Sequence, residues 1–414
     1  MHRHLARTLA FIAISTLLAT SAYAASPTPP ALPVIEEAGS PQFTSIGGAA
    51  PLATDKTVPH WHGQFTDPTN GVTYGYNMVG LEDPRNAGAG TTTIPVDIIP
   101  LRLEFTAEGG YALDGANAVS LTMASPVFQD ADYTSTAFSS GGAGPLSAGN
   151  VGVQYEDAIM RSQFNKTGTA YHLKFAAPTV FDAVTLKVPK GKGDAVINRR
   201  GVILGLADIN WFSTNVQSLM GSLHTDPTHL PIFLTDNVML YIGSPAICCV
   251  IGYHGAAKAT GLGYGPTNGN GNQGVQTFAF AAYSRPGTFN PASSHFVTDI
   301  HALSHEIAEW GDDPFVNNTV NPWLTPTAPQ YGCSGFLETG DPVVGIGFHL
   351  PNNPDTRPYS DGSWHPEDEV FLPWFARETP NHTSQLTQSG TGGRYTFMGD
   401  LNPYPGFRQA ATGC

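Results

Sequence analysis

The sequence predicts an α+β protein with a loop-rich mixed sheet, and three observations lead to this prediction. Glycine and proline number 46 and 34, whereas charged residues make up only 13% of the 414-residue chain. Such a composition is typical of many turns and unlike that of a helical bundle. Short runs with alternating polarity predict strands, and a few segments with helical periodicity predict helices between them.

The N-terminal segment predicts export. Residues 1–24 carry basic side chains near the start, an apolar run over 9–18 and the triplet Ala22-Tyr23-Ala24. This is the pattern of a signal peptide, and the apolar run is short for a membrane anchor, which is the alternative. We therefore expect a secreted protein, extracellular or periplasmic, without a membrane anchor. Residues 25–55, rich in proline and alanine, are interpreted as a linker or short pro-segment.

The mature chain is expected to be acidic. Without Arg3 and Arg7, 17 basic residues stand against 33 acidic ones, a net charge of about −16. A surface of this sign disfavours nucleic acid and anionic membranes as partners.

Four cysteines, an even number in an oxidising compartment, predict two disulfide bonds in one of three alternative pairings. They are Cys248, Cys249, Cys333 and Cys414. A bond between the neighbours Cys248 and Cys249 is the least expected pairing. A bond from Cys333 to that pair would hold the loop that precedes Glu338.

Residues 56–290 are expected to form an N-terminal, β-rich lobe. The predicted strands are 72–79, 93–99, 171–175, 184–188, 230–240 and 276–283. The predicted helices are 155–164 and 211–223, the second as a backing helix. Strand 276–283 is a candidate to pair with an extended substrate, the alternative being an ordinary core strand. Residues 291–414 are expected to form an active-site helix and a smaller C-terminal lobe.

The active-site helix combines an apolar stripe with a face of metal-ligand side chains. On a helical wheel, the stripe is formed by Phe296, Ile300, Leu303, Ile307 and Trp310. His301, His305 and Glu309, spaced four apart, gather on the opposite face. Glu306 is placed beside this face, where it would accept a proton from a metal-bound water. The alternative is an exposed polar helix face that happens to spell the motif.

Downstream carboxylates complete the predicted centre. Glu338 is the preferred third ligand, and Asp341 is expected to accept a hydrogen bond from the distal nitrogen of His305. His301, Asp312 and Asp313 compete for both roles. Asp313 also precedes a proline, so the alternative is that it only ends the helix.

Two further segments carry titratable side chains. His254 is interpreted either as a transition-state donor in the cleft or as a structural histidine. Residues 364–377 are dense in acids and aromatics and are expected to pack against the helix lobe. The alternative for this segment is a substrate subsite or a calcium site built from Glu367, Asp368 and Glu369.

The spelling His305-Glu306-x-x-Glu309 resembles the H-E-x-x-H helix of gluzincin-type metallopeptidases, with glutamate in place of the second histidine. With Glu338-Thr339-Gly340-Asp341 downstream and Cys248-Cys249 upstream, it looks like the secreted H-E-x-x-E proteins that include the plant exordium, or phosphate-induced, group. The resemblance covers roughly residues 230–345. It implies a zincin-like metallopeptidase fold and a secreted location.

These observations predict a secreted zinc-dependent hydrolase, specifically a metalloendopeptidase acting on a peptide or protein in an extended conformation. His305, Glu309 and Glu338 are the predicted zinc ligands, Glu306 the general base and His254 a further catalytic residue. The second carboxylate makes the metal a weaker Lewis acid, and manganese or iron would also suit the site. The alternative is a non-catalytic secreted or cell-surface binding protein on a degenerate zincin frame.

Overall fold

The computed structural model describes residues 32–35, 38, 42–43, 48–51, 53, 55–133, 150–258, 274–290, 297–326, 328, 332–378, 395–398 and 414. The predicted signal peptide, its cleavage position and most of the predicted linker lie outside these residues. In the part of the chain that is described, no helix has the length and apolar character needed to cross a membrane.

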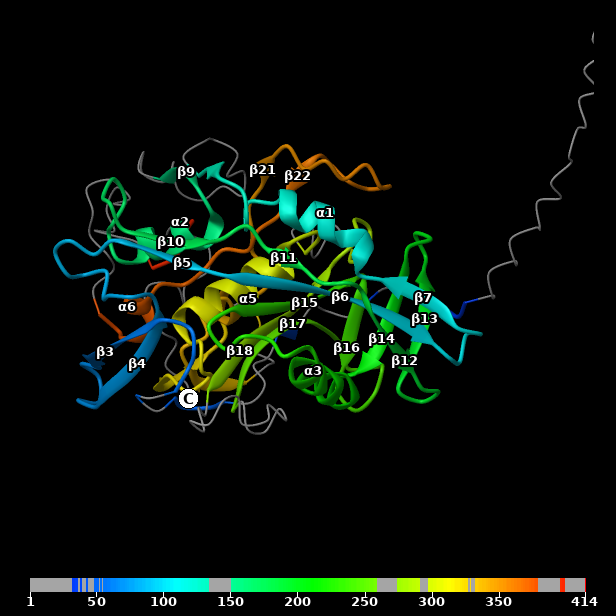
Figure 1. Cartoon of the computed structure of the whole chain (residues 1–414), viewed down its shortest axis with the longest axis horizontal. Helices are drawn as coiled ribbons and strands as arrows, with labels where there is room; N and C mark the ends of the chain where they lie inside the picture. The colour runs from blue at the N-terminus through cyan, green and yellow to red at the C-terminus, as the bar shows by residue number, and fades with distance from the viewer. Residues whose placement is uncertain are drawn as a thin grey trace, which may run out of the picture.

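A 12-stranded sheet with parallel and antiparallel pairs forms the centre of the structure (Figure 1). Its strands, in spatial order, are β1 (Val34–Ile35), β13 (Gly193–Asn198), β14 (Ile203–Asp208), β16 (Val238–Tyr241), β17 (Cys248–Lys258), β18 (Val275–Tyr283), β15 (Leu230–Asp236), β6 (Val96–Phe105) and β11 (Thr179–Val180). Off this path, β7 (Tyr111–Asp114) and β12 (Val184–Val188) pair with β6, and β2 (Gln42–Phe43) pairs with β17. The predicted α+β class with a mixed sheet is confirmed.

Smaller elements surround the sheet. Five two-stranded sheets join β3 (His60–Thr66) to β4 (Thr73–Val79), β5 (Thr91–Ile94) to β10 (His172–Phe175), β8 (Ala131–Asp132) to β9 (Val151–Val153), β19 (Thr319–Leu324) to β20 (Cys333–Phe336), and β21 (Leu350–Pro351) to β22 (Ser363–Trp364). The helices are α1 (Ala116–Ala124), α2 (Tyr155–Gln163), α3 (Ile209–Leu223), α5 (His301–Asp312), the 3₁₀ helix η4 (Asp341–Val343) and α6 (Leu372–Phe375). The helices predicted at 155–164 and 211–223 are confirmed as α2 and α3.

Two of the predicted strands are each divided into two. Pro95 separates β5 from β6, and Asn237, with φ 60°, separates β15 from β16. Proline cannot donate to a strand ladder, and asparagine tolerates a left-handed backbone. Each break lets the two halves pair with different neighbours.

Strand β18 lies in the interior of the sheet. It is parallel to β15 on one side and antiparallel to β17 on the other, and all nine of its residues are buried. The prediction that this strand pairs with an extended substrate is therefore wrong, because the 11-residue β17 occupies the edge that a substrate would need. The alternative of a core strand is confirmed.

Helices α3 and α5 cover opposite faces of the sheet (Figure 1). Neighbouring residues of a strand point to opposite faces. On β17, the Tyr253 ring packs edge-on against Phe212 of α3 with ring centroids 6.5 Å apart. The next residue, His254, contacts Glu306 of α5. The predicted backing helix therefore lies behind the sheet as seen from α5.

Helix α5 is buried on every side. Its twelve residues are all buried, and His305 and Glu306 have no exposed surface at all. Trp310 of the predicted apolar stripe donates from Nε1 to Thr277 of β18 at 2.9 Å. The other side faces residues 364–377, called the C-terminal segment from here on, since the Glu367 backbone N–H donates to Ser304 Oγ at 2.9 Å. The alternative of an exposed polar face is wrong.

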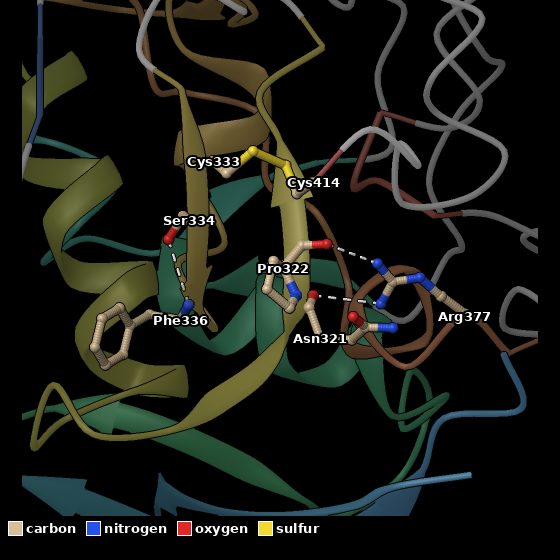
Figure 2. The surroundings of a disulfide bond; sticks show 7 residues. All are labelled: Asn321, Pro322, Cys333, Ser334, Phe336, Arg377 and Cys414. Carbon is tan, nitrogen blue, oxygen red and sulfur yellow. Dashed lines mark hydrogen bonds between the residues drawn. A yellow bond between two sulfur atoms is a disulfide. The ribbon is translucent and has the colours of Figure 1, made fainter. Parts of the chain in front are cut away.

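The cysteines form two disulfides, Cys248–Cys249 and Cys333–Cys414. The expectation that the neighbouring pair is the least favoured is wrong, and the peptide bond between these two residues is cis. Cys333 does not bond to this pair because it begins β20, which pairs with β19 and not with β17. Figure 2 shows Cys414 bonded at this point, so the chain before Glu338 is joined to the C-terminus.

Candidate metal centre

Three side chains form a group of potential metal donors beside α5. Donor atoms of His305, Glu309 and Asp341 all lie within 4.8 Å of one another. His305 Nε2 is 3.1 Å from Glu309 Oε1, and two ligands of a single tetrahedral zinc ion lie about 3.4 Å apart. His305 and Glu309 come from successive turns of the helix, whereas Asp341 begins η4.

The third donor of this group is Asp341, and Glu338 points elsewhere. Glu338 Oε2 lies 3.7 Å from His254 Nε2, and neither Glu338 oxygen accepts a hydrogen bond from the described residues. The backbone N–H of Asp341 donates to Glu309 Oε1 at 3.2 Å, which holds Asp341 beside the helix. The geometry favours Asp341 as the third ligand, while the ligand role of Glu338 stays a prediction.

Glu367 occupies the position behind His305 that the sequence analysis gave to Asp341. Its Oε2 accepts a hydrogen bond from His305 Nδ1 at 2.9 Å, and Gly345 N–H donates to its Oε1 at 3.2 Å. A carboxylate on Nδ1 fixes the tautomer in which Nε2 is available to a metal. The assignment of this bond to Asp341 is wrong, because the C-terminal segment returns over α5 and Glu367 occupies the position next to Nδ1.

His301 lies beside Glu367, on the side of His305 that faces away from the donor group. It is fully buried, and its Nε2 is 3.2 Å from Glu367 Oε2. Burial, followed by the positive charge of His305, lowers the pKa of His301 well below its usual value. Of the roles predicted for His301, the contact with Glu367 favours the supporting one.

Asp313 terminates α5. The helix ends at Asp312, and the Asp313 carboxylate accepts the N–H groups of Asn317 at 2.9 Å and Asn318 at 3.1 Å. These backbone groups of the turn after the helix hold the Asp313 carboxylate. The helix-ending role is confirmed, and Asp313 is in neither donor group that contains Glu309.

His254 connects β17 to the carboxylates of α5. Its Nδ1 is 3.3 Å from Glu306 Oε2 and 3.5 Å from Glu309 Oε2, and its Nε2 is 3.2 Å from the Asp313 carbonyl oxygen. His254, Glu306 and Glu309 form a second group of donors within 4.8 Å of one another. Since both ring nitrogens have partners inside the protein, the structural role of His254 is favoured over a donor in a cleft.

The carboxyl groups of Glu306 and Glu309 have different environments. Burial raises the pKa of Glu306 to about 7. Burial also opposes the charge of Glu309, but the positive charge of His305 and a hydrogen bond from His254 lower its pKa to about 2. Glu309 is thus an ionised donor, whereas Glu306 is suited to exchanging a proton near neutral pH.

Glycine at position 252 makes room for Glu306. A Cβ atom on Gly252 would lie 2.6 Å from Glu306 Oε1, closer than real Cβ contacts. Residues 252 and 254 share the face of β17 that meets α5. The absence of a side chain at Gly252 therefore allows Glu306 to lie between helix and sheet.

Buried acidic groups outnumber buried histidines in this centre. Glu306, Glu309, Asp313, Glu338 and Glu367 are at most 4% exposed. Burial, reinforced by the charge of Glu309, raises the pKa of both Glu338 and Asp341 well above the usual range. Uncompensated buried carboxylates are costly, and a divalent cation would supply the missing positive charge. The residues present therefore fit a bound metal ion.

The consecutive acids of the C-terminal segment have separate partners. Glu369 Oε1 accepts a hydrogen bond from Tyr155 Oη at 3.0 Å, and Asp368 Oδ1 accepts one from the Met398 N–H at 2.8 Å. Glu367 is bonded to His305. The predicted calcium alternative has no shared donor group in the described part of the chain.

Sequence reasoning missed two features. Glu367 was assigned to packing or calcium and not to His305, 62 residues away. A third donor group, formed by His349, Asp361 and His365, was not recognised at all. Asp361 and His365 are four residues apart, a spacing that brings two side chains together in a helix. No helix is predicted over these residues, so the spacing did not indicate a shared site.

No protein-family model, no curated protein and no solved structure matches the chain. The resemblance to secreted H-E-x-x-E proteins and the zincin-like fold therefore stay predictions that rest on the motif residues.

Proposed function

We propose that this protein is a secreted metal-dependent hydrolase, with zinc as the metal and a peptide bond as the bond that is cleaved. The observation that carries the proposal is the position of Glu306 beside the donor group of His305, Glu309 and Asp341, in which His305 and Glu309 are buried and Asp341 is half-buried. Hydrolysis with a metal-bound water requires this combination of ligands and a nearby proton acceptor.

Each side chain has one role in this proposal. His305, Glu309 and Asp341 hold the metal, and Glu367 orients the His305 ring. A bound zinc ion lowers the pKa of water and polarises a carbonyl oxygen. Glu306 takes the proton from the attacking water and delivers it to the leaving amine as the C–N bond breaks. His254 keeps Glu306 and Glu309 oriented through its Nδ1 contacts.

A second candidate is a binding protein in which the metal is structural. The observation that favours it is burial, because His305 and Glu306 have no exposed surface and Glu309 is only 2% exposed. Structural zinc sites are closed, whereas a catalytic site keeps a position open to substrate. The two candidates differ in whether Glu306 affects turnover.

Replacement of Glu306 by glutamine separates the two candidates. For the hydrolase, Glu306→Gln retains the zinc and loses about 10²–10⁴-fold in turnover of a mixed fluorogenic peptide library. His305→Ala loses the zinc, as elemental analysis after dialysis would show. Glu82→Gln, the same change at an exposed position, serves as the matched control.

Two results would contradict the hydrolase. One is wild-type protein that binds no zinc at the His305 centre. The other is Glu306→Gln protein that cleaves peptides at the wild-type rate. Bound zinc without cleavage of any peptide supports the binding protein.

A further inference from the structure

We infer that the chain has a second site for a divalent transition metal, formed by His349, Asp361 and His365 at the wall of a surface pocket. Their donor atoms lie within 4.8 Å of one another. Asp361 Oδ2 is 3.5 Å from His349 Nδ1 and 3.3 Å from His365 Nε2. No residue of this group belongs to the centre on α5.

The donor set and its spacing suit zinc. Ligands of one tetrahedral zinc ion lie about 3.4 Å apart, which agrees with both distances to Asp361. The rings of His349 and His365 are 4.6 Å apart between centroids and inclined by 69°, so they are not stacked face to face. Two imidazoles and one carboxylate are a set that zinc and neighbouring transition metals accept, unlike the all-oxygen sets of calcium.

A buried carboxylate orients His365. Asp299 is 1% exposed, and its Oδ2 accepts a hydrogen bond from His365 Nδ1 at 2.7 Å. Its Oδ1 accepts the His365 backbone N–H at 3.0 Å. With Nδ1 held in this way, Nε2 is directed toward Asp361. Histidines that bind metals commonly have such a carboxylate behind them, and Glu367 holds His305 in the same manner.

The three donors line a pocket of about 310 Å³. Apolar side chains of Phe289 and Val297 and the ring of Tyr359 line the same pocket. Three protein ligands leave one position of a tetrahedral metal open. An open position beside an apolar wall is suited to water or to the anionic group of an organic ligand.

The inference does not rest on the proposed hydrolase function. Asp299 lies two residues before His301, and His365 lies two residues before Glu367, so the two centres are neighbours along the chain. A fold disturbance at one would affect the other. The test therefore removes each centre separately.

The test measures zinc binding to metal-stripped full-length mature protein by isothermal titration calorimetry. We expect two zinc ions in the wild type and one in His305→Ala. Adding His349→Ala to the His305→Ala protein should abolish the remaining binding, and adding Asp299→Asn should weaken it about 10–100-fold. His62→Ala in the same background, an exposed histidine of β3, should change nothing.

Unaltered zinc binding after His349→Ala in the His305→Ala background would overturn the inference, as would a His305→Ala protein that folds but binds no zinc. If His305→Ala fails to fold, the zinc stoichiometry of His349→Ala in the wild-type background tests the second site instead. Loss of one zinc ion with an unchanged unfolding transition supports the site, and unchanged stoichiometry rejects it. Absence of peptide hydrolysis would reject the proposed function and leave this result intact.

Discussion

Two histidines in the donor groups, His305 and His365, are each oriented by a carboxylate that binds the ring nitrogen facing away from the donor group. His305 presents Nε2 to Glu309 because Glu367 holds Nδ1. His365 presents Nε2 to Asp361 because Asp299 holds Nδ1. The supporting carboxylate decides which ring nitrogen is available, so it would contribute to the affinity for a bound metal without touching that metal.

Glu367→Gln is expected to weaken zinc binding at the His305 centre about 10–100-fold. The amide keeps the volume of the side chain but accepts the hydrogen bond from His305 Nδ1 less strongly than a carboxylate, so it holds the His305 tautomer less firmly. Competition with a chromophoric chelator measures the affinity. Glu369→Gln is the matched control, since Glu369 lies in the same buried segment and bonds to Tyr155 instead. Equal affinities of the two variants would show that Glu367 does not support the ligand.

Gly252→Ala is expected to lower the free energy of unfolding by about 1–3 kcal/mol, the usual cost of overpacking. The new Cβ would approach Glu306 Oε1 to 2.6 Å and displace it from the space between β17 and α5. Urea denaturation measures the change. Gly335→Ala, on strand β20, is the control because the nearest atom to its new Cβ, outside its chain neighbours, is 3.9 Å away. If Gly335→Ala lowered the free energy of unfolding as much, the effect at Gly252 would be due to the loss of glycine's backbone flexibility and not to packing.

Helix packing places a further acid out of contact with water. Glu156 of α2 is fully buried beside α5, and neither of its carboxylate oxygens accepts a hydrogen bond from the described residues. Burial, followed by the charges of Asp312 and Asp157, raises the pKa of Glu156 well above its usual value. The folded protein therefore keeps a proton that the unfolded chain releases.

This difference predicts how stability depends on pH. The unfolded chain releases the Glu156 proton above about pH 4.3, so the free energy of unfolding falls as pH rises from there toward the pKa of the folded state. Each unit of pH in that range costs up to about 1.4 kcal/mol. Between pH 5 and 8, urea denaturation of Glu156→Gln should show a shallower decline than the wild type.

The exposed change Glu82→Gln provides the comparison, and its decline should match that of the wild type. A decline in Glu156→Gln as steep as that in the wild type would mean that Glu156 is already ionised in the folded protein.

Helices were predicted correctly from local periodicity. The position of a strand in the sheet was not, because it depends on which strands pair with it. The periodicity of 155–164 and 211–223 predicted α2 and α3, because a helical period is a pattern within a few adjacent turns. The pattern of 276–283 predicted a strand but not its neighbours. Whether β18 forms an edge depends on whether β17 pairs with it, and the residues of 276–283 do not encode that pairing.

At the scale of the whole molecule, the Cys333–Cys414 bond joins the C-terminus to β20 (Figure 2). Arg377 Nη2 donates to the Pro322 carbonyl at 2.8 Å on the neighbouring β19, so this region has both a covalent and a polar connection. The bond spans 81 residues of sequence. A closed loop of that length restricts the unfolded chain strongly.

Cys333→Ser is expected to lower the free energy of unfolding by about 4 kcal/mol in non-reducing buffer. Because the effect belongs to the bond, Cys414→Ser and the double variant should show the same loss. Urea denaturation of the three proteins measures it. Losses that add in the double variant would show that the two side chains contribute separately and not through a shared disulfide.

The sequence by itself determined the local part of this protein. His305, Glu306 and Glu309 are grouped because a helix brings residues one turn apart to the same side, and this relation needs no information from the rest of the chain. Only the tertiary structure decided what completes the centre. His254 reaches Glu306 across 52 residues, and Glu367 reaches His305 across 62. Contacts at that separation follow from strand pairing and from the return of the C-terminal segment over α5, which no local periodicity encodes.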